Sequence, residues 1–279
     1  MIFKTDDEAL KIIKENLSLN PKFKTLREKN DELEALVNGD EFLDLLINKI
    51  EGLESPLKAK ARKKYSKSIK DLFQRLFQPI DNVYYATGGM KDYNIESEVL
   101  KKQYLEFISN VRDGRTLNEW VQLNAIQLMN TDPNGLMFLE YQTIPELKCY
   151  PTYKSIQSIR FYKSAGQCLD FILFEPKQVT DVSGTYYLWR IVDDLTDRTF
   201  KQVGGDFMIE SEMTFEHPFG QVPALLNSNI TVAGKEEAFT AIDKILDVAK
   251  EYARDQSFLS FLICSNSSII CFLKTLSFI

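Results

Sequence analysis

The chain has 279 residues and a mass of 32.2 kDa, enough to bury a sizeable core in one large domain or two small ones. Its 44% hydrophobic and 27% charged residues are the proportions of a folded, water-soluble protein. The net charge of −6 excludes a protein that coats nucleic acid through bulk positive charge and leaves room only for local basic patches.

The first part of the chain is predicted to be helical. Residues 5–8, Thr-Asp-Asp-Glu, form a capping box in which the threonine and a glutamate three residues later cap the first turn. We expect this helix to end near Asn20-Pro21, and a second helix to run from about Leu26 to Ile50. A third helix is predicted to begin near Ser55-Pro56, because proline is tolerated in a first helical turn.

The third predicted helix carries seven basic residues and no acid between Lys58 and Lys70. One interpretation is a surface that faces phosphates or an acidic partner. The other is a solvated helix face whose lysine stems cover apolar surface beneath them. The aromatic residues here follow the core stripe and are not interleaved as stacking platforms, which favours the solvated face.

A short strand at 83–86 is predicted to enter a glycine turn, which lacks the frame of a phosphate-binding loop. Two further helices follow, one over about 96–111 whose apolar side includes Leu100 and Val111, and one that opens with a second capping box at 116–119. The turn at 131–135, Thr-Asp-Pro-Asn-Gly, ends the helical half.

From Leu136 to Phe215 the hydrophobic period changes to two, which is typical of β-strands. Short strands joined by tight turns, such as the acidic turn at 193–197, indicate an antiparallel meander. We expect its inner face to include Phe171, Trp189 and Phe207. The fold class is therefore α+β.

Pro218 and Pro223, with Gly220 between them, cannot continue either kind of element, so this stretch ends the β region. A long amphipathic helix is predicted from about Lys235 to Gln256, where apolar residues recur at spacings of three and four. The chain is accordingly divided into an N-terminal helical segment at 1–54, a helical and antiparallel β region at 55–233, the start of a long helix at 234–258 and an atypical hydrophobic tail at 259–279.

The last stretch, 258–279, has one charged residue, Lys274, and a length near that needed to cross a bilayer. However, residues 265–268, Ser-Asn-Ser-Ser, would place polar groups at its centre, and no basic flank would fix its orientation. We expect a truncated or frame-shifted end in place of a sequence that continues the helix.

The sequence predicts no catalytic residue, no cofactor site and no metal site, and it assigns no nucleic-acid-binding residue. The only histidine, His217, lies in the connection after the β region and is predicted to be structural. Asp193, Asp194 and Asp197 could gather a divalent cation, but no glycine stands where an EF-hand loop requires one. Because Walker, GxSxG and Rossmann patterns are also absent, the chain does not read as an enzyme.

The cysteines show neither a CxxC pair nor the spacing of zinc ligands; they are Cys149, Cys168, Cys264 and Cys271. The N-terminus has no signal-peptide pattern, so we expect a reducing cytoplasm.

Three stretches resemble the portal proteins of tailed bacteriophages. They are 75–89 (RLFQPIDNVYYATGG), 131–140 (TDPNGLMFLE) and 217–223 (HPFGQVP), the last followed by the helix that contains 241–246 (AIDKIL). The resemblance covers about 55–258, and each of its motifs is structural rather than catalytic.

The resemblance implies a structural protein with an antiparallel wing region that ends in a glycine- and proline-containing turn before a stem helix. Portal subunits form a homo-oligomeric ring at one capsid vertex. The expected partners are other portal subunits, capsid and scaffolding proteins, the terminase, the tail connector and the double-stranded DNA that passes through the ring. The expected location is the virion, assembled in the cytoplasm of a bacterial host. Further stem helices and a clip, which a usual portal has, are missing where the tail at 259–279 begins.

Two other functions remain open from the residues alone. One is a metal-dependent hydrolase that uses Asp193, Asp194 and Asp197. The other is a membrane-tethered binding module anchored by residues 258–279.

Overall fold

The computed structural model describes residues 3–38, 95–124, 131–142, 148–165, 168–182, 184–226, 230–231 and 238–239. The chain divides into two compact units, of which the first comprises Met1–Asn30 and Gly88–Phe239. Every site discussed below lies within this first unit. The basic run at 58–70, the strand at 83–86, the helix at 235–256 and the tail at 259–279 lie outside the described residues.

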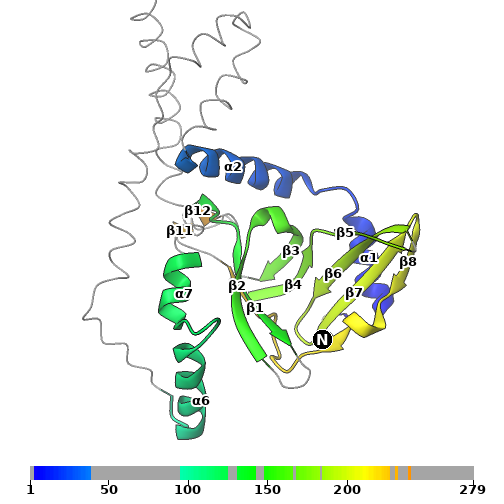
Figure 1. Ribbon diagram of the computed structural model, residues 1–279. Helices are drawn as coiled ribbons and strands as arrows, with labels where there is room; N and C mark the ends of the chain where they lie inside the picture. The colour runs from blue at the N-terminus through cyan, green and yellow to red at the C-terminus, as the bar shows by residue number, and fades with distance from the viewer. Residues whose placement is uncertain are drawn as a thin grey trace, which may run out of the picture. The chain divides into compact units, whose positions relative to one another are not determined.

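The helices that the structure describes are α1 (Asp6–Glu15), α2 (Pro21–Asn38), α6 (Glu98–Ser109) and α7 (Leu117–Asn124) (Figure 1). The predicted capping box is confirmed at α7, and at α1 its threonine half is confirmed, while Glu8 Oε2 accepts from the Lys4 N–H. At α1, the Glu8 N–H donates to Thr5 Oγ1 over 3.3 Å. At α7, the Glu119 N–H donates to Thr116 Oγ1 over 3.3 Å, and the Thr116 N–H donates to Glu119 Oε2 over 2.8 Å. Each box satisfies backbone donors that a first helical turn would leave unpaired.

The start of α2 differs from the prediction, which placed it near Leu26. The helix begins at Pro21, where the missing proline N–H costs nothing, because the first N–H groups of a helix have no partner inside it. The Lys22 N–H donates to Asn20 Oδ1 over 2.9 Å and so caps this end. The spacing of apolar residues predicted the buried side of α2 but not its first helical turn.

Helix α6 also differs from its predicted packing. Its expected apolar side included Leu100, but 58% of this residue is exposed, and α6 contains no buried residue. Val111, expected on the same side, is buried just beyond the helix end. It packs with Trp120 of α7, which is also buried.

The strands form two main antiparallel sheets (Figure 1). The three-stranded sheet has the order β10-β1-β2, from β1 (Leu136–Gln142), β2 (Lys148–Lys154) and β10 (Ala224–Leu226). The seven-stranded sheet contains β3 (Ile159–Ala165), β4 (Cys168–Phe174), β5 (Lys177–Asp181), β6 (Gly184–Val192), β7 (Thr196–Val203), β8 (Asp206–Ile209) and β9 (Phe215–Glu216). The short elements are η1 (Ile156–Ser158), η2 (Ser211–Met213) and the pair β11 (Ile230–Thr231) and β12 (Ala238–Phe239).

This architecture confirms a mixed α+β fold in which N-terminal helices precede antiparallel sheets. The predicted meander over 136–215 is divided between the two sheets, because β1 pairs with β2 on one side and with β10 on the other, and β2 does not continue into β3. The local hydrophobic period locates strands but does not specify which strands pair over long separations.

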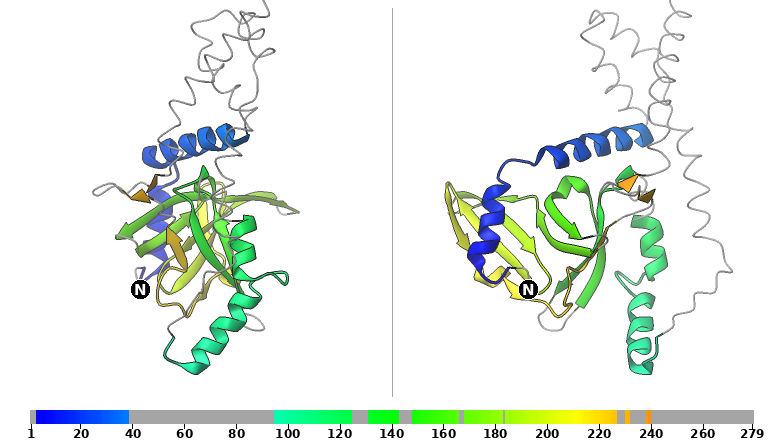
Figure 2. Two further views of the ribbon diagram at one scale, coloured as in Figure 1. Left: turned by 90° about the vertical axis from the view of Figure 1, so that its left-hand side faces the viewer. Right: turned by 180° about the vertical axis from the view of Figure 1, so that it is seen from behind.

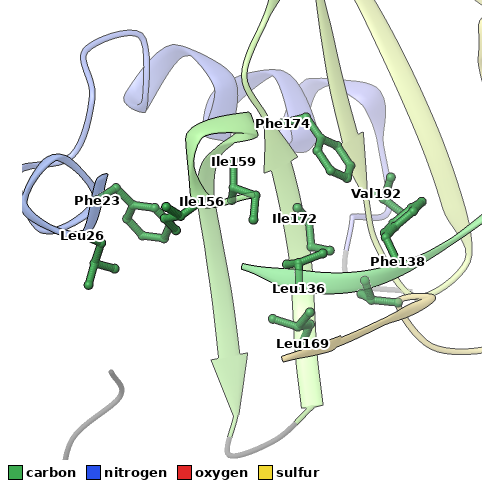
Figure 3. Packing of buried hydrophobic residues seen from close by; sticks show 11 residues of the cluster. Phe23, Leu26, Leu136, Phe138, Ile156, Ile159, Leu169, Ile172, Phe174 and Val192 are labelled. Carbon is green, nitrogen blue, oxygen red and sulfur yellow. The ribbon is translucent and has the colours of Figure 1, made fainter. Parts of the chain in front are cut away.

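The seven-stranded sheet is covered on both faces. On one face a cluster joins it to β1 and α2; Figure 3 shows Phe23 and Leu26 of α2 together with Ile159 and other buried residues of this cluster. In the same cluster the rings of Phe138 and Phe174 meet edge to face, with centroids 5.4 Å apart.

On the other face, α1 lies across the sheet (Figure 2). Ile13 of α1 packs in the same cluster as Phe171 and Trp189, both of which are buried as predicted. Phe207, expected on this inner face, is half-buried, with its ring centroid 6.5 Å from that of Trp189. Burial on both faces is why Phe171–Phe174 of β4 are consecutive buried residues instead of alternating ones.

Candidate functional site

The acidic turn between β6 and β7 is held by a fully buried carboxylate. Asp193 Oδ1 accepts hydrogen bonds from the Leu195 N–H over 3.0 Å and from the Thr196 N–H over 2.7 Å. Asp193 Oδ2 lies 3.1 Å from Arg198 Nη1 and accepts from the Phe3 N–H over 3.2 Å. The Asp193 carboxylate, which was considered as a cation ligand, therefore stabilises the β6–β7 turn and binds the N-terminal segment.

Arg198 completes this anchor. Its Nε lies 3.0 Å from Asp6 Oδ1, and its Nη2 donates to the Phe3 carbonyl over 3.0 Å. Only 5% of Arg198 is exposed, and its pair with Asp193 is buried, whereas the Asp6 side chain is 55% exposed. The pair of charged residues fixes the entry of the chain into α1.

Burial by itself would raise the pKa of Asp193, but the hydrogen bonds from Leu195, Thr196 and Phe3 outweigh it and hold the pKa below its ordinary value. A carboxyl group whose pKa is lower in the folded state stabilises the fold above its unfolded pKa, about 3.9, and loses this contribution as the pH falls further.

We expect Asp193→Asn to lower the free energy of unfolding at pH 7 by about 1.5–3 kcal/mol, because hydrogen bonds to a charged acceptor are lost. The difference from the unmodified protein should shrink as the pH falls below about 4, where Asp193 is protonated first in the unfolded chain and, at lower pH, also in the folded protein. Urea unfolding followed by circular dichroism from pH 7 to pH 2.5 measures both effects. Asp206→Asn, at an exposed position of β8, is the matched control and should change little. A constant difference across this range would contradict the assignment.

Asp197 is used differently, although it is close in sequence. It lies in β7 instead of the turn, its Oδ2 is 2.7 Å from Arg190 Nη2, and it accepts a hydrogen bond from the Tyr141 hydroxyl over 3.1 Å. Asp194 is half-buried in the turn itself. Within the described residues no group of three or more His, Cys, Asp or Glu side chains could hold a metal ion. The geometry thus gives no support to a hydrolase built on Asp193, Asp194 and Asp197.

His217 lies just after β9 and is 3% exposed. Its Nε2 is 3.0 Å from the Asp193 carbonyl oxygen, so the ring donates a hydrogen bond there. Its backbone N–H donates to the Leu195 carbonyl over 2.8 Å. The ring also packs against Tyr141 and Phe219, with centroid separations of 5.6 and 5.4 Å. These contacts tie the stretch after β9 to the β6–β7 turn.

Arg190 of β6 forms the most extensive ionic network in the described part of the chain. Its guanidinium contacts both carboxylate oxygens of Asp197 and both carboxylate oxygens of Glu140, at distances of 2.7–3.1 Å. Lys154 Nζ lies 2.6 Å from Glu140 Oε1 and extends the network to β2. Because Glu140 belongs to β1 and Asp197 to β7, Arg190 joins the two sheets by charge-assisted hydrogen bonds.

The network sets the charge state of its members. Burial alone would raise the pKa of Glu140, but the bonds to Arg190 and Lys154 outweigh it and hold the pKa below the ordinary value. Burial would lower the pKa of Arg190, yet Asp197 and Glu140 raise it overall. Burial and the neighbouring Asp197 together raise the pKa of the Tyr141 hydroxyl, which keeps its proton.

This network forms part of the wall of a cavity of about 780 Å³ in the first unit. The cavity lies between residues of β1, β2 and η1 and residues of β4, β6, β7 and η2. Its apolar walls are Phe174, Pro176, Leu188, Met213 and Phe215. Most of the other lining residues are polar or charged, among them Glu175, Lys177 and Glu212, so charges of both signs face this space.

Neither Arg190 nor the cavity was identified from the sequence. The sequence does contain one indication of this network: a single charged residue within each of two apolar strand segments. Arg190 follows Trp189 in one, and Glu140 follows Leu139 in the other. Two opposite charges at such positions predict a pair between neighbouring layers, because buried charges are found with partners.

The two cysteines in the described residues are free thiols. Cys149 is half-buried, and burial raises the pKa of its thiol, whereas Cys168 is exposed. Cys264 and Cys271 lie outside the described residues. A raised thiol pKa lowers the thiolate fraction, so Cys149 is not set up as a nucleophile.

No helix among the described residues is long and apolar enough to span a bilayer. The segment considered for a membrane anchor, 258–279, is not among them.

No protein-family model matches the chain, and no curated protein matches its sequence.

Proposed function

We propose that this chain is the N-terminal and wing portion of a bacteriophage portal protein, a structural subunit without catalytic activity. The observation that carries the proposal is the pairing of β1 with β10. β10 directly follows one of the stretches that resemble portal proteins, 217–223, so its pairing with β1 brings the end of that stretch beside another, 131–140, across most of the β region.

The contacts around this pairing are specific. Leu136, Met137 and Phe138 of β1 pair with Leu226, Leu225 and Ala224 of β10 in that order. The Leu139 N–H donates to the Pro223 carbonyl over 2.8 Å and extends the pairing into the turn. Gly220, between the two prolines, has φ of +66°, a backbone conformation that residues other than glycine rarely adopt. The turn residues of the third stretch therefore have a conformational reason to be present.

The turn at 131–135 is equally constrained. Asp132 is 1% exposed, and its Oδ2 accepts a hydrogen bond from the Ile156 N–H over 2.8 Å. A Cβ atom at Gly135 would lie 2.5 Å from the Tyr153 hydroxyl oxygen and 2.8 Å from its ring. Tyr153 in turn donates to the Asp132 carbonyl, so its ring cannot shift without losing this bond.

We expect Gly135→Ala to lower the free energy of unfolding by about 1–3 kcal/mol, because the added methyl group overpacks the contact with Tyr153. The measurement is the urea midpoint at constant m-value. Gly205→Ala is the matched control, since nothing lies within 4 Å of a Cβ atom at that position. Equal stability of the two variants would show that Gly135 has no packing role.

In this proposal the two antiparallel sheets belong to the wing, and His217–Pro223 leads the chain from the wing toward a stem helix. The subunit acts by assembly: copies form a ring at the capsid vertex, through which double-stranded DNA enters and leaves. Its partners are then other portal subunits, capsid and scaffolding proteins, the terminase and the tail connector, and its location is the virion.

Assembly provides the test. The 279-residue chain is compared with a longer chain in which the stem and clip region of a phage portal protein replaces residues 259–279. We expect the longer chain to form a discrete ring and the 279-residue chain to be mainly monomeric or irregularly associated, because a closed ring needs complementary surfaces on both sides of each subunit. Light scattering and negative-stain microscopy distinguish these states. A longer chain that stays monomeric over a wide concentration range, both with and without scaffolding and capsid proteins, would overturn the proposal.

A further inference from the structure

Strand β5 is an edge strand of the seven-stranded sheet. All five of its residues pair with β6, with which it forms a hairpin (Figure 1). On its other side, no strand of the described part of the chain pairs with it. Its side chains are exposed except for Val179, which is half-buried. The outer edge of β5 therefore presents backbone donors and acceptors that a strand from another molecule can use.

The register of the hairpin shows which backbone groups of β5 face outward. In an antiparallel ladder, residue pairs that exchange backbone hydrogen bonds alternate with pairs that do not. The hairpin closes at Asp181 and Gly184, the position of the hydrogen-bonded pair of a tight turn. The next pair, Thr180 and Thr185, is then of the other kind, and its two hydroxyl oxygens lie 3.1 Å apart, as suits the closer spacing of such a pair. The N–H and C=O groups of Thr180, and by the same alternation those of Gln178, point away from β6.

The sequence of β5 is complementary to a second, antiparallel copy of itself. When the two copies are centred on Val179, Lys177 lies opposite Asp181 at both ends of the pair. Gln178 lies opposite Thr180, so the outward backbone groups of these two residues meet and form hydrogen bonds. Opposite charges directly across two strands stabilise the pairing. A shift of the register by one residue would lose both the charge pairs and the match of the backbone groups.

Charged residues on an edge strand often have the opposite role, which is to keep other strands away. That explanation fits a lone lysine or a run of like charges, because either would repel a second copy. In β5, however, Lys177 and Asp181 are equally distant from Val179, so each charge meets its opposite. The Asp181 carboxylate also accepts a hydrogen bond from the Tyr186 hydroxyl, and a carboxylate has lone pairs for a further donor.

We propose that two copies of this chain associate through β5, as an antiparallel pair with a two-fold axis at Val179. Because only two five-residue strands meet, the contact is smaller than the roughly 1,200–2,000 Å² of a stable interface, and we expect a Kd of about 0.1–1 mM. At lower concentrations the chain is mostly monomeric. This contact does not depend on the portal proposal, because a two-fold contact closes on itself, whereas neighbours in a ring meet head to tail.

Disulfide cross-linking of the full chain, with its four natural cysteines replaced by serine, tests the register. Val179→Cys places the two thiols directly opposite each other, at a Cα separation that a disulfide can span. We expect mild oxidation near the expected Kd to give a covalent dimer. Gln178→Cys is the matched control, because it is the exposed neighbour but lies opposite Thr180 of the second copy. It should give about tenfold less dimer.

Charge reversal tests the pairing itself, by sedimentation velocity at increasing protein concentration. Lys177→Asp and Asp181→Lys each place like charges at both ends of the pair and should each weaken association by about tenfold. These two variants change the net charge in opposite directions, so a change in overall repulsion cannot weaken both. The doubly reversed variant, Lys177→Asp with Asp181→Lys, should associate as the unmodified protein does, and so should an equimolar mixture of the two single variants.

Three results would each overturn the proposal. The first is equal cross-linking by Val179→Cys and Gln178→Cys. The second is no covalent dimer from Val179→Cys, which would leave the edge bare or open to a strand of a different protein. The third is a doubly reversed variant that associates as weakly as the single ones.

Discussion

Replacing Trp189 with alanine is expected to lower the free energy of unfolding by about 3–5 kcal/mol, the range for a large aromatic side chain removed from a core. Trp189 is 4% exposed and packs beneath α1 in the cluster that contains Ile13 and Phe171. Its indole Nε1 donates to Gln202 Oε1 over 2.7 Å, so the substitution also removes a hydrogen bond. Urea unfolding monitored by circular dichroism gives the change directly.

The matched control is Tyr187→Ala, two residues earlier on the same strand. Tyr187 is 42% exposed, and its removal should cost far less than that of Trp189. A Trp189→Ala variant within about 0.5 kcal/mol of the unmodified protein, the range of surface substitutions, would show that this face of β6 is not a core face.

Replacing Arg190 with methionine is expected to cost a similar amount, about 3–5 kcal/mol, for a different reason. Methionine keeps much of the side-chain volume but leaves the carboxylates of Glu140 and Asp197 without their shared partner. Asp197 is 1% exposed, so its charge cannot be compensated by water. Thermal and urea unfolding at pH 7 measure the loss.

Two further variants separate lost charge pairing from lost packing. Adding Glu140→Gln and Asp197→Asn to Arg190→Met removes the unpaired charges and should recover most of the stability, because a buried ion pair often contributes little over neutral groups. Lys163→Met is the control for a surface pair: it breaks the ion pair with Asp170, in which the Lys163 side chain is 67% exposed. This change should cost at most about 1 kcal/mol. No recovery in the triple variant would mean that Arg190 stabilises the fold by packing alone.

The features that could be predicted from the sequence are those encoded by neighbouring residues. Both capping boxes depend on residues three apart, and the strands depend on a period of two. The inward positions of Phe171 and Trp189 follow from the same period and are confirmed. The absence of any catalytic pattern is likewise a local property of the chain, and it stays a prediction.

The features that could not be predicted depend on residues far apart in the chain. The pairing of Leu136 with Leu226 has no counterpart in any local pattern, so the division into two sheets was missed. Arg190 was overlooked because successive residues of β6 point to opposite faces of the sheet, so Arg190 lies on the face opposite Trp189. In a sheet with only one buried face, that opposite face is exposed to solvent. Here that face meets the three-stranded sheet, where Glu140 lies. The candidate site therefore depends on burial of both faces of the seven-stranded sheet, which the two-residue hydrophobic period does not predict.

The anchor between the N-terminal segment and the β6–β7 turn has a consequence for synthesis on the ribosome. Phe3 and Asp193 are 190 residues apart, and Asp6 and Arg198 are 192 apart. At about 5–20 residues per second, the partners of Phe3 and Asp6 are made roughly 10–40 s after them. During this interval the apolar side of α1, with Ala9 and Ile13, has no sheet to cover it. The N-terminal segment is thus among the first parts of the unit to leave the ribosome and among the last to be buried.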